Sequence, residues 1–293
     1  MVAMVEGTPS GTAYRVALRR AAHQVFDHPL VFIDPLAVRI VGADRRGSSA
    51  QLDLRAPSRP SSVSLRAFLV ARSRFAEDTL AEAFTAGVRQ YVLLGAGLDT
   101  FAYRNPHADL RVFEVDHPDT QHWKLSLLAD NGISVPSSTT HVAVDFHHDV
   151  LAERLAAAGF DATQPAVFAW LGVVPYLTDE GFTATMRTLS SYAQGSVMVM
   201  DYGLPRESLP LLERLAFDSL AARVAAAGEP FRLFFEPQAL HARLAQYGWE
   251  VIADLDRDST NECYFKGRTD GLRILGGGGH LLSAKITHSV TAS

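Results

Sequence analysis

Cysteine is nearly absent from this chain. Cys263 is the only one in 293 residues, so an intramolecular disulfide cannot form, and neither can a zinc or iron–sulfur site made of several thiolates. A chain of this length buries roughly three quarters of the surface that its unfolded form exposes. It therefore needs neither a disulfide nor a structural metal for stability, and we expect no metal site.

Positive charge and long apolar runs are also scarce. The formal net charge is −5, which argues against a nucleic-acid partner because such proteins usually present a basic surface. The most apolar stretch, Ala166–Leu177, is too short to cross a bilayer and contains Pro175. The first 20 residues lack the apolar block of a signal peptide. We therefore expect a cytoplasmic protein with no membrane partner.

Helical and strand-like patterns alternate along the chain, which is typical of strands joined by crossover helices. The expected strands are Gln90–Leu94, Arg111–Val115, Thr140–Val144, Ala166–Leu171, Ser196–Met200, Glu250–Ala253 and Leu281–Ile286. The expected helices are Thr12–Gln24, Ser62–Thr85, Thr120–Ala129, Val150–Ala158, Asp179–Tyr192 and Pro237–Tyr247. This order predicts an α/β, Rossmann-like fold, with a mostly parallel, doubly wound sheet and helices on both faces.

No change of composition and no internal repeat divides the chain, so we predict one domain over residues 1–293. Within it, residues 1–85 form a helical N-terminal extension, and residues 86–293 form the core, with an insertion at about 203–231. The extension and the insertion are the natural lid over a site. We interpret the stripe of Leu209, Leu212 and Leu215 in the insertion as core packing.

A glycine turn follows the first predicted strand. The segment Tyr91–Leu94 runs into Gly95, Ala96 and Gly97, and a helix is expected at or soon after Asp99. Glycine allows a sharp turn and the close approach of a ligand. In doubly wound sheets, ligands bind at this edge, beyond the carboxyl ends of the strands. A single Gly-x-Gly also fits any tight strand-to-helix turn, so the motif alone leaves both interpretations open.

An acid at the end of the second predicted strand favours an adenosine ligand. Asp116 follows Gly97 by 19 positions, the spacing at which a carboxylate reaches ribose hydroxyls. The alternative is that Asp116 only caps the helix that begins near His117 and Pro118.

The residues after the glycine turn distinguish between adenosine cofactors. A dinucleotide site prefers a third glycine where this chain has Thr100, and Asp99 would repel a pyrophosphate. Beside the cationic sulfonium or ammonium of S-adenosylmethionine, a carboxylate is neutral or attractive. The charge pattern therefore favours S-adenosylmethionine over a nicotinamide dinucleotide.

Arg72 lies on an otherwise apolar helix face. Leu65, Phe68, Leu69 and Phe75 share that face by their spacing. A guanidinium there is costly unless it is paired, and arginine binds carboxylates such as that of the methionine moiety with two parallel hydrogen bonds. The alternative is an arginine whose head extends to the helix edge.

Several motifs together resemble a known family. The chain is similar to the leucine carboxyl methyltransferase superfamily, and within it to the bacterial class I S-adenosylmethionine-dependent branch, which includes O-methyltransferases of polyketide pathways. The resemblance covers about Thr12 to Ile286. Its most specific part is the Gly95–Arg104 block, and the other similar segments are Arg19–His23, Asp34–Ala37, Ala71–Arg74, Glu114–Pro118, Gly172–Leu177 and Tyr264–Arg268.

The resemblance implies a role for each matching residue. Arg72 would hold the carboxylate of the methyl donor, and Asp116 would bind the ribose. The other cofactor-binding residues implied are Gly95, Gly97, Asp99, Asp145, Phe146, Leu171 and Tyr176. Asp145 would accept from the adenine amine, and the ring of Phe146 would stack on the base. Members that act on a phosphatase have a glutamate where this chain has Leu171, so a protein C-terminus is not the acceptor we expect.

The expected reaction is in-line methylation of an acceptor oxygen. A carboxylate is already ionised at pH 7 and needs no general base, and no histidine–acid pair is evident in the segments expected near the methyl group. We therefore predict a carboxylate or an acidic hydroxyl on a small molecule. Candidate lid and substrate-binding residues are Tyr14, Arg19, Phe32 and Tyr202, with an arginine suited to an acidic acceptor.

Two other function classes stay open at this point. A nicotinamide-dependent oxidoreductase would bind NAD at the same edge of the sheet. A non-catalytic S-adenosylmethionine-binding protein would have the cofactor site and transfer no methyl group. The sequence identifies neither the acceptor nor the oligomeric state.

Overall fold

The computed structural model describes residues 11–42, 60–145, 148–226 and 228–287. Phe146, predicted to stack on adenine, lies outside these ranges. Within them, no helix combines the length and the apolar character needed to span a membrane.

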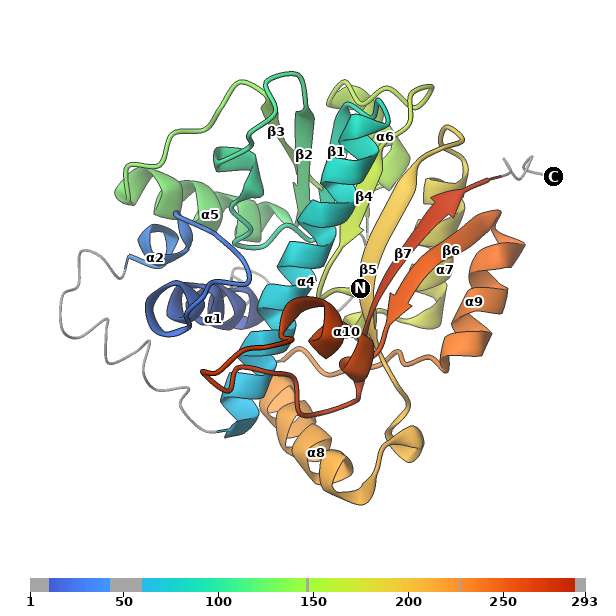
Figure 1. The fold of residues 1–293 in the computed structure, drawn as a ribbon. Helices are drawn as coiled ribbons and strands as arrows, with labels where there is room; N and C mark the ends of the chain where they lie inside the picture. The colour runs from blue at the N-terminus through green and yellow to red at the C-terminus, as the bar shows by residue number, and fades with distance from the viewer. Residues whose placement is uncertain (1–10, 43–59, 146–147, 227, 288–293) are drawn as a thin grey trace.

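A sheet of seven strands forms the centre of the described residues (Figure 1). Its order is β3-β2-β1-β4-β5-β7-β6, in which β7 runs antiparallel to β5 and β6 and the other pairs are parallel. The strands are β1 (Gln90–Leu94), β2 (Arg111–Asp116), β3 (Thr139–Ala143), β4 (Val167–Trp170), β5 (Val197–Gly203), β6 (Trp249–Leu255) and β7 (Gly279–Ile286). The chain reverses its direction of travel across the sheet between β1 and β4, which places the topological switch point there.

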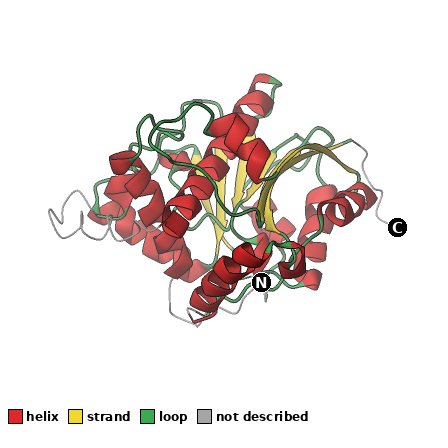
Figure 2. Ribbon diagram, turned by 60° about the horizontal axis from the view of Figure 1, so that its bottom comes forward, coloured by secondary structure: helices red, strands yellow, loops and turns green. Residues whose placement is uncertain are grey.

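Helices cover both faces of the sheet (Figure 2). On one face, α6 (Leu151–Ala157), α7 (Asp179–Ser190) and α9 (Pro237–Gln246) bury leucine, methionine and phenylalanine side chains. On the other face, α4 (Pro60–Thr85) packs along the sheet. β1 is buried on both sides, as the apolar run in its sequence predicts. The predicted fold class is confirmed.

The N-terminal segment packs against α4 and α5. Helix α1 (Gly11–Phe26) contacts α2 (Ala37–Ile40) and α4. Helices α1 and α2 share a cluster of buried alanines and aliphatic residues with α5 (Pro118–Asp130). The cluster fixes α1 across the loop that follows β1.

The chain after the glycine turn differs from the prediction. We expected a helix to begin at or soon after Asp99, and the structure has only a three-residue 3₁₀ helix, η1 (Phe101–Tyr103). The Asp99 carboxylate accepts a hydrogen bond from the backbone N–H of Phe101 at 2.7 Å, which supports a tight turn in place of a longer helix. Further short helices are η2 (Val174–Tyr176) and η3 (Arg206–Ser208).

Besides the four-residue α2, two helices were missed by the sequence patterns. One is α10 (Arg257–Tyr264), and the other is α8 (Leu211–Ala226) in the insertion after β5. Our interpretation of the leucine stripe as core packing is wrong for two of its members: Leu212 and Leu215 are 79% and 60% exposed, whereas Leu209 is buried. Leu212 and Leu215 lie on α8, which covers a cavity and is not part of the core.

Candidate functional site

A large cavity opens at the carboxyl ends of β1, β2, β4 and β5. Its volume is about 1480 Å³, and its walls include α1, the first half of α4 and one face of α8. Figure 1 shows α8 beyond the end of the sheet at which β4 and β5 finish. Pockets for one drug-sized ligand have volumes of about 300–1,000 Å³. The cavity therefore has room for a cofactor and a second small molecule.

The glycine turn forms one wall of this cavity. Gly95 has a φ of 71° and Gly97 a φ of 47°, values that favour glycine. A Cβ on Gly95 would lie 2.5 Å from Cγ2 of Val173, and one on Gly97 would lie 3.2 Å from the Cβ of Ala13 in α1. The turn is thus pressed between η2 and α1, and no side chain fits at Gly95.

Asp116 holds the glycine turn from the next strand. Its Oδ2 accepts a hydrogen bond from the Gly97 N–H at 2.6 Å, and its Oδ1 accepts from the His117 N–H at 2.7 Å. Burial raises its pKa above the ordinary value, although both hydrogen bonds act in the opposite direction. The capping alternative is wrong, because the N-cap of α5 is His117, whose side chain accepts from the Asp119 N–H. Each carboxylate oxygen keeps further acceptor capacity toward the cavity.

Arg72 lies inside the molecule and does not extend to the helix edge. It is 7% exposed, and its Nη1 donates to Oδ2 of Asp201 at 3.1 Å. Asp201 also accepts from the backbone N–H of Gly172, and a Cβ on Gly172 would lie 2.6 Å from Nη1 of Arg72. The Nε of Arg72 is buried and has no hydrogen-bond partner among the described residues. Arg72 therefore lines the cavity and has one unsatisfied donor.

Asp99 lines the cavity with a partner that the sequence patterns missed. Its Oδ2 accepts from Nη1 of Arg20 at 3.3 Å, and the same guanidinium donates to the carbonyl oxygen of Leu98. Burial raises the pKa of Asp99, but the charges of Arg20, Lys124 and Arg104 outweigh burial, so its pKa lies below the ordinary value. The acid that we expected beside a cationic ligand is thus already paired within the protein.

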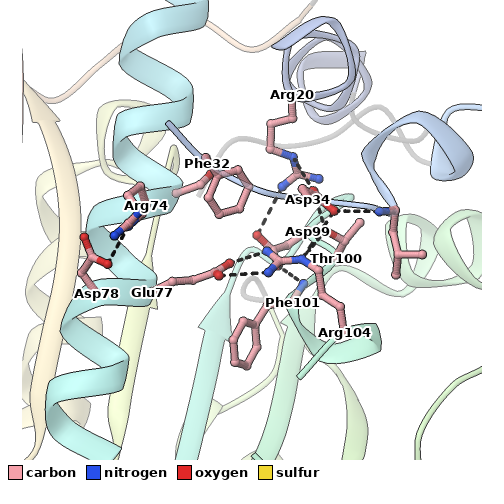
Figure 3. Close-up of polar contacts among 12 residues, drawn as sticks. Arg20, Phe32, Asp34, Arg74, Glu77, Asp78, Asp99, Thr100, Phe101 and Arg104 are labelled. Carbon is pink, nitrogen blue, oxygen red and sulfur yellow. Dashed lines mark hydrogen bonds and ion pairs between the residues drawn. The ribbon is translucent and has the colours of Figure 1, made fainter. Parts of the chain in front are cut away.

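The Arg20 pair belongs to a network that joins α1 and Asp34 to the segment after the glycine turn and to α4 (Figure 3). Asp34, which is fully buried, accepts from the Thr100 hydroxyl at 2.7 Å. It also lies 3.8 Å from Nε of Arg20 and 3.4 Å from Nε of Arg104. Arg104 in turn donates to Glu77 of α4 through both terminal nitrogens. Arg20, Asp34 and Arg104 all lie in motifs that resemble the family, but their contacts are not evident from spacing.

The remaining predicted cofactor residues have different surroundings. Asp145, Leu171 and Tyr176 all line the cavity. Burial, with the charge of Glu229, raises the pKa of Tyr176 to about 12. The ring of Tyr176 lies 5.2 Å from that of Phe231, which connects η2 to the segment after α8. Leu171 packs at the edge of two buried clusters and offers no polar group.

The four predicted substrate residues separate into two pairs. Arg19 and Tyr202 line the cavity. Tyr14 and Phe32 are not brought to it: the Tyr14 ring packs 6.1 Å from that of Trp123, and Phe32 is buried with its ring 5.0 Å from the Arg104 guanidinium. Tyr14 lies on the side of α1 that faces Trp123 of α5. Phe32 lies in a buried loop against Arg104, so neither side chain faces the cavity.

The structure also contains histidine–acid pairs that the sequence did not reveal. Asp254 accepts from the Tyr202 hydroxyl at 2.7 Å and lies 2.9 Å from Nδ1 of His280. Tyr202 is the member of this cluster that lines the cavity, and neither Asp254 nor His280 does. Among the described residues, the histidines that line the cavity are His117 and His148, at the β2 and β3 edge. No group of three potential metal ligands occurs in the same ranges.

The fold and this arrangement of a glycine turn and a strand-end acid are those of an adenosine-binding α/β enzyme class. The chain belongs to the leucine carboxyl methyltransferase family, whose model matches residues 13–190. A Bacillus subtilis (strain 168) protein named "Putative S-adenosyl-L-methionine-dependent methyltransferase YktD" is 30% identical over 296 aligned positions, which cover 92% of this chain and 95% of that protein. A similarly named protein of Mycolicibacterium smegmatis is 36% identical over 222 positions, covering 73% and 71%.

Solved structures show the same fold at low identity. The structure of a protein from Thermobifida fusca named "putative methyltransferase" matches with a TM-score of 0.58 and 17% identity, covering 97% of each chain. A DUF574-family protein from Streptomyces avermitilis matches with a TM-score of 0.56 and 18% identity, covering 92% of this chain and 96% of that one. The predictions of family and fold are therefore confirmed.

Proposed function

We propose that this protein is an S-adenosylmethionine-dependent methyltransferase that methylates a carboxylate or an acidic hydroxyl of a small molecule. The observation that carries the proposal is one continuous cavity. Gly95, Gly97, Asp116 and Arg72 line one part of it, and largely apolar side chains line another part. Family membership and the names of the relatives support the cofactor and the class of reaction.

The side chains present fit the cofactor. The unpartnered Nε of Arg72 suits the carboxylate of its methionine part. The carboxylate of Asp116, held by two backbone N–H groups, suits the ribose hydroxyls. The glycine turn lets the backbone approach the ligand closely. When bound, the cofactor supplies an electrophilic methyl group on a cationic sulfur.

The chain's own residues position the acceptor and exclude water. An acceptor oxygen gains the methyl group, and the electron pair of the broken methyl–sulfur bond stays on sulfur. Lids from α1 and α8 cover the cavity, and a dry, ordered site of this kind can contribute about 7–11 kcal/mol through positioning. No step requires proton removal if the acceptor is already an anion.

The surroundings of the cavity support an acidic acceptor. Within the described ranges, the lining histidines lie on the cofactor side, and the Tyr202 hydroxyl donates to Asp254. The pKa of Tyr202 is raised well above its ordinary value by burial and by Asp254, so this phenol does not serve as a base near neutral pH.

Two experiments test the proposal. Calorimetric titration of the full chain with S-adenosylhomocysteine and with NAD separates it from the oxidoreductase alternative: tight binding of NAD without binding of S-adenosylhomocysteine would overturn it. With an acceptor in hand, turnover is expected to be nearly flat from about pH 6 to pH 9, because a carboxylate stays ionised throughout. A steep rise near pH 7 that disappears on mutation of one histidine would contradict the base-free reaction.

A further inference from the structure

One part of the cavity is apolar and adjoins Tyr176, whose ring lies 5.2 Å from that of Phe231. A whole face of α8 lines it, because the residues concerned recur every three to four positions. The rings of Phe217 and Phe234 have centroids 5.5 Å apart, and those of Phe217 and Phe231 have centroids 6.1 Å apart. The apolar wall consists mainly of Phe68, Leu212, Phe217, Leu220, Phe231 and Phe234. Such a wall suits a rigid or branched apolar body.

Three arginines line the same cavity, and none of them has an acidic partner among the described residues. Arg15 and Arg19 belong to α1 and Arg223 to α8. Nη1 of Arg19 donates to the carbonyl oxygen of Arg15 at 3.1 Å, and Nη1 of Arg223 donates to the Ser219 hydroxyl at 2.8 Å. In the part of the chain that the structure describes, no ion pair joins these three guanidinium groups to a carboxylate. In the same part, Nε of Arg19 is buried and has no hydrogen-bond partner.

The other two arginines of the cavity wall behave differently. Arg20 is paired with Asp99 at 3.3 Å, and Arg72 is paired with Asp201 at 3.1 Å. Their charges are thus balanced inside the protein. Arg20 and Arg72 are therefore charge-balanced, whereas Arg15, Arg19 and Arg223 have no ion pair within the described ranges.

The three charges act on one another. Burial lowers the pKa of Arg19, and the charges of Arg223, Arg15 and Arg66 lower it further. The charge of Arg66 is balanced by Asp27, which accepts from its Nε at 2.7 Å and its Nη2 at 2.8 Å. Placing the like charges of Arg15, Arg19 and Arg223 close together in a partly buried site is unfavourable unless an anion binds between them.

Two acidic side chains, Glu213 and Glu229, line this part of the cavity. Glu213 accepts from Arg257 at 3.0 Å and from the Gly277 N–H at 2.6 Å. Glu229 lies within electrostatic reach of Tyr176, whose pKa it raises. Neither forms a described ion pair with Arg19.

We infer that Arg19, assisted by Arg15 and Arg223, binds a carboxylate of the methyl acceptor, and that the acceptor is an amphipathic small molecule whose ring-containing apolar body lies against α8. The inference rests on the proposed function and adds the substrate class. Arg19 is then a specificity-determining residue, because a guanidinium recognises a carboxylate with two parallel hydrogen bonds. The apolar wall contributes affinity for the body without selecting its charge.

Paired probes test this inference. The full chain, saturated with S-adenosylhomocysteine, is titrated by calorimetry with 2-naphthoate, 4-phenylbenzoate and decanoate, and with the methyl ester of each. We expect at least one carboxylate to bind about tenfold more tightly than its ester. Arg19→Gln should weaken binding of that carboxylate at least about tenfold, the loss expected when hydrogen bonds to a charged group disappear. Arg19→Lys should fall between the two, because lysine keeps the charge and loses the fork.

The control is Arg187→Gln, which removes an equal charge from an exposed position on α7, outside the cavity. It should leave every affinity unchanged, and Arg19→Gln should leave ester binding and S-adenosylhomocysteine binding unchanged. Equal carboxylate affinity in the wild type and in Arg19→Gln would overturn the inference, as would a set in which no carboxylate binds more tightly than its ester. Failure of the wild type to bind S-adenosylhomocysteine would instead refute the proposed function.

Discussion

Replacing Asp116 with alanine should weaken both the glycine turn and cofactor binding. The two carboxylate oxygens each accept one backbone N–H, from Gly97 at 2.6 Å and from His117 at 2.7 Å. Alanine leaves both donors without their acceptor. The same change removes the carboxylate that we propose for the ribose. One substitution therefore has two separable effects.

The size of each effect follows from the contacts. A hydrogen bond to a charged group contributes about 1.5–3 kcal/mol. Asp116 is only partly buried, so water can replace part of both bonds in the variant. We therefore expect a loss of unfolding free energy of about 1.5–3 kcal/mol for the two bonds together. Loss of the ribose contacts should lower cofactor affinity at least about tenfold, or about 1.4 kcal/mol.

Two measurements separate these effects. Urea unfolding of the ligand-free protein reports the turn, and calorimetry with S-adenosylhomocysteine reports the ribose site. Asp116→Asn should fall between wild type and alanine, since its amide retains one acceptor oxygen but presents N–H groups to the other donor. Asp109→Ala is the matched control, because Asp109 is an exposed acid whose partner is Arg89.

The outcome can contradict the reasoning in either part. Unchanged stability in Asp116→Ala would mean that the turn does not depend on this carboxylate. Unchanged affinity, with the fold intact, would mean that the strand-end acid does not bind the cofactor, and the proposed ribose site would be wrong.

Three further substitutions have defined consequences. Gly95→Ala should abolish cofactor binding and cost more stability than Gly271→Ala in urea unfolding, because both glycines have positive φ but only Gly95 lacks space for a Cβ; equal losses would refute the close packing. Arg72→Met should lower the unfolding free energy by about 3–5 kcal/mol, because it leaves Asp201 buried without its ion-pair partner; an unchanged midpoint would contradict the pair. The pKa of Asp27 is below its ordinary value of 3.8, because hydrogen bonds and charge from its partners outweigh burial. The Asp27 carboxylate therefore stabilises the fold above pH 3.8, and this stabilisation is lost as the pH falls through the lower, folded-state pKa. The stability gap between wild type and Asp27→Asn should therefore shrink from pH 7 to pH 3 in urea unfolding, and a constant gap would refute this linkage.

The strands could be predicted because their signal is local. Val92–Leu94 is apolar on both faces, and the expected strand Gln90–Leu94 matches β1 residue for residue. The strand-end position of Asp116 follows from the similar pattern of the second strand. The register of β1 beside β2 and β4 then brings the turn and the acid together. Because parallel strands end at one edge of the sheet, the site edge follows from the topology.

The lids and the ion pairs could not be predicted in the same way. Helix α8 carries apolar residues all round, so the leucine stripe does not reveal that one of its faces lines a cavity. Arg20 contacts Asp99 across 79 residues of sequence, and Arg72 contacts Asp201 across 129. Such partners follow from tertiary packing and not from spacing. The same reason explains why Tyr14 and Phe32, which sit in lid segments, face away from the cavity.

The central claim is that this protein transfers a methyl group from S-adenosylmethionine to an acidic oxygen. The most direct test incubates the full chain with S-adenosylmethionine labelled on the methyl group and a small-molecule extract, then treats the products with mild base. We predict protein-dependent label that mild base releases as methanol, the behaviour of a methyl ester, or that stays on an acidic hydroxyl as an ether. Label found only on nitrogen or carbon, or no transfer by a protein that binds the cofactor, would contradict the account.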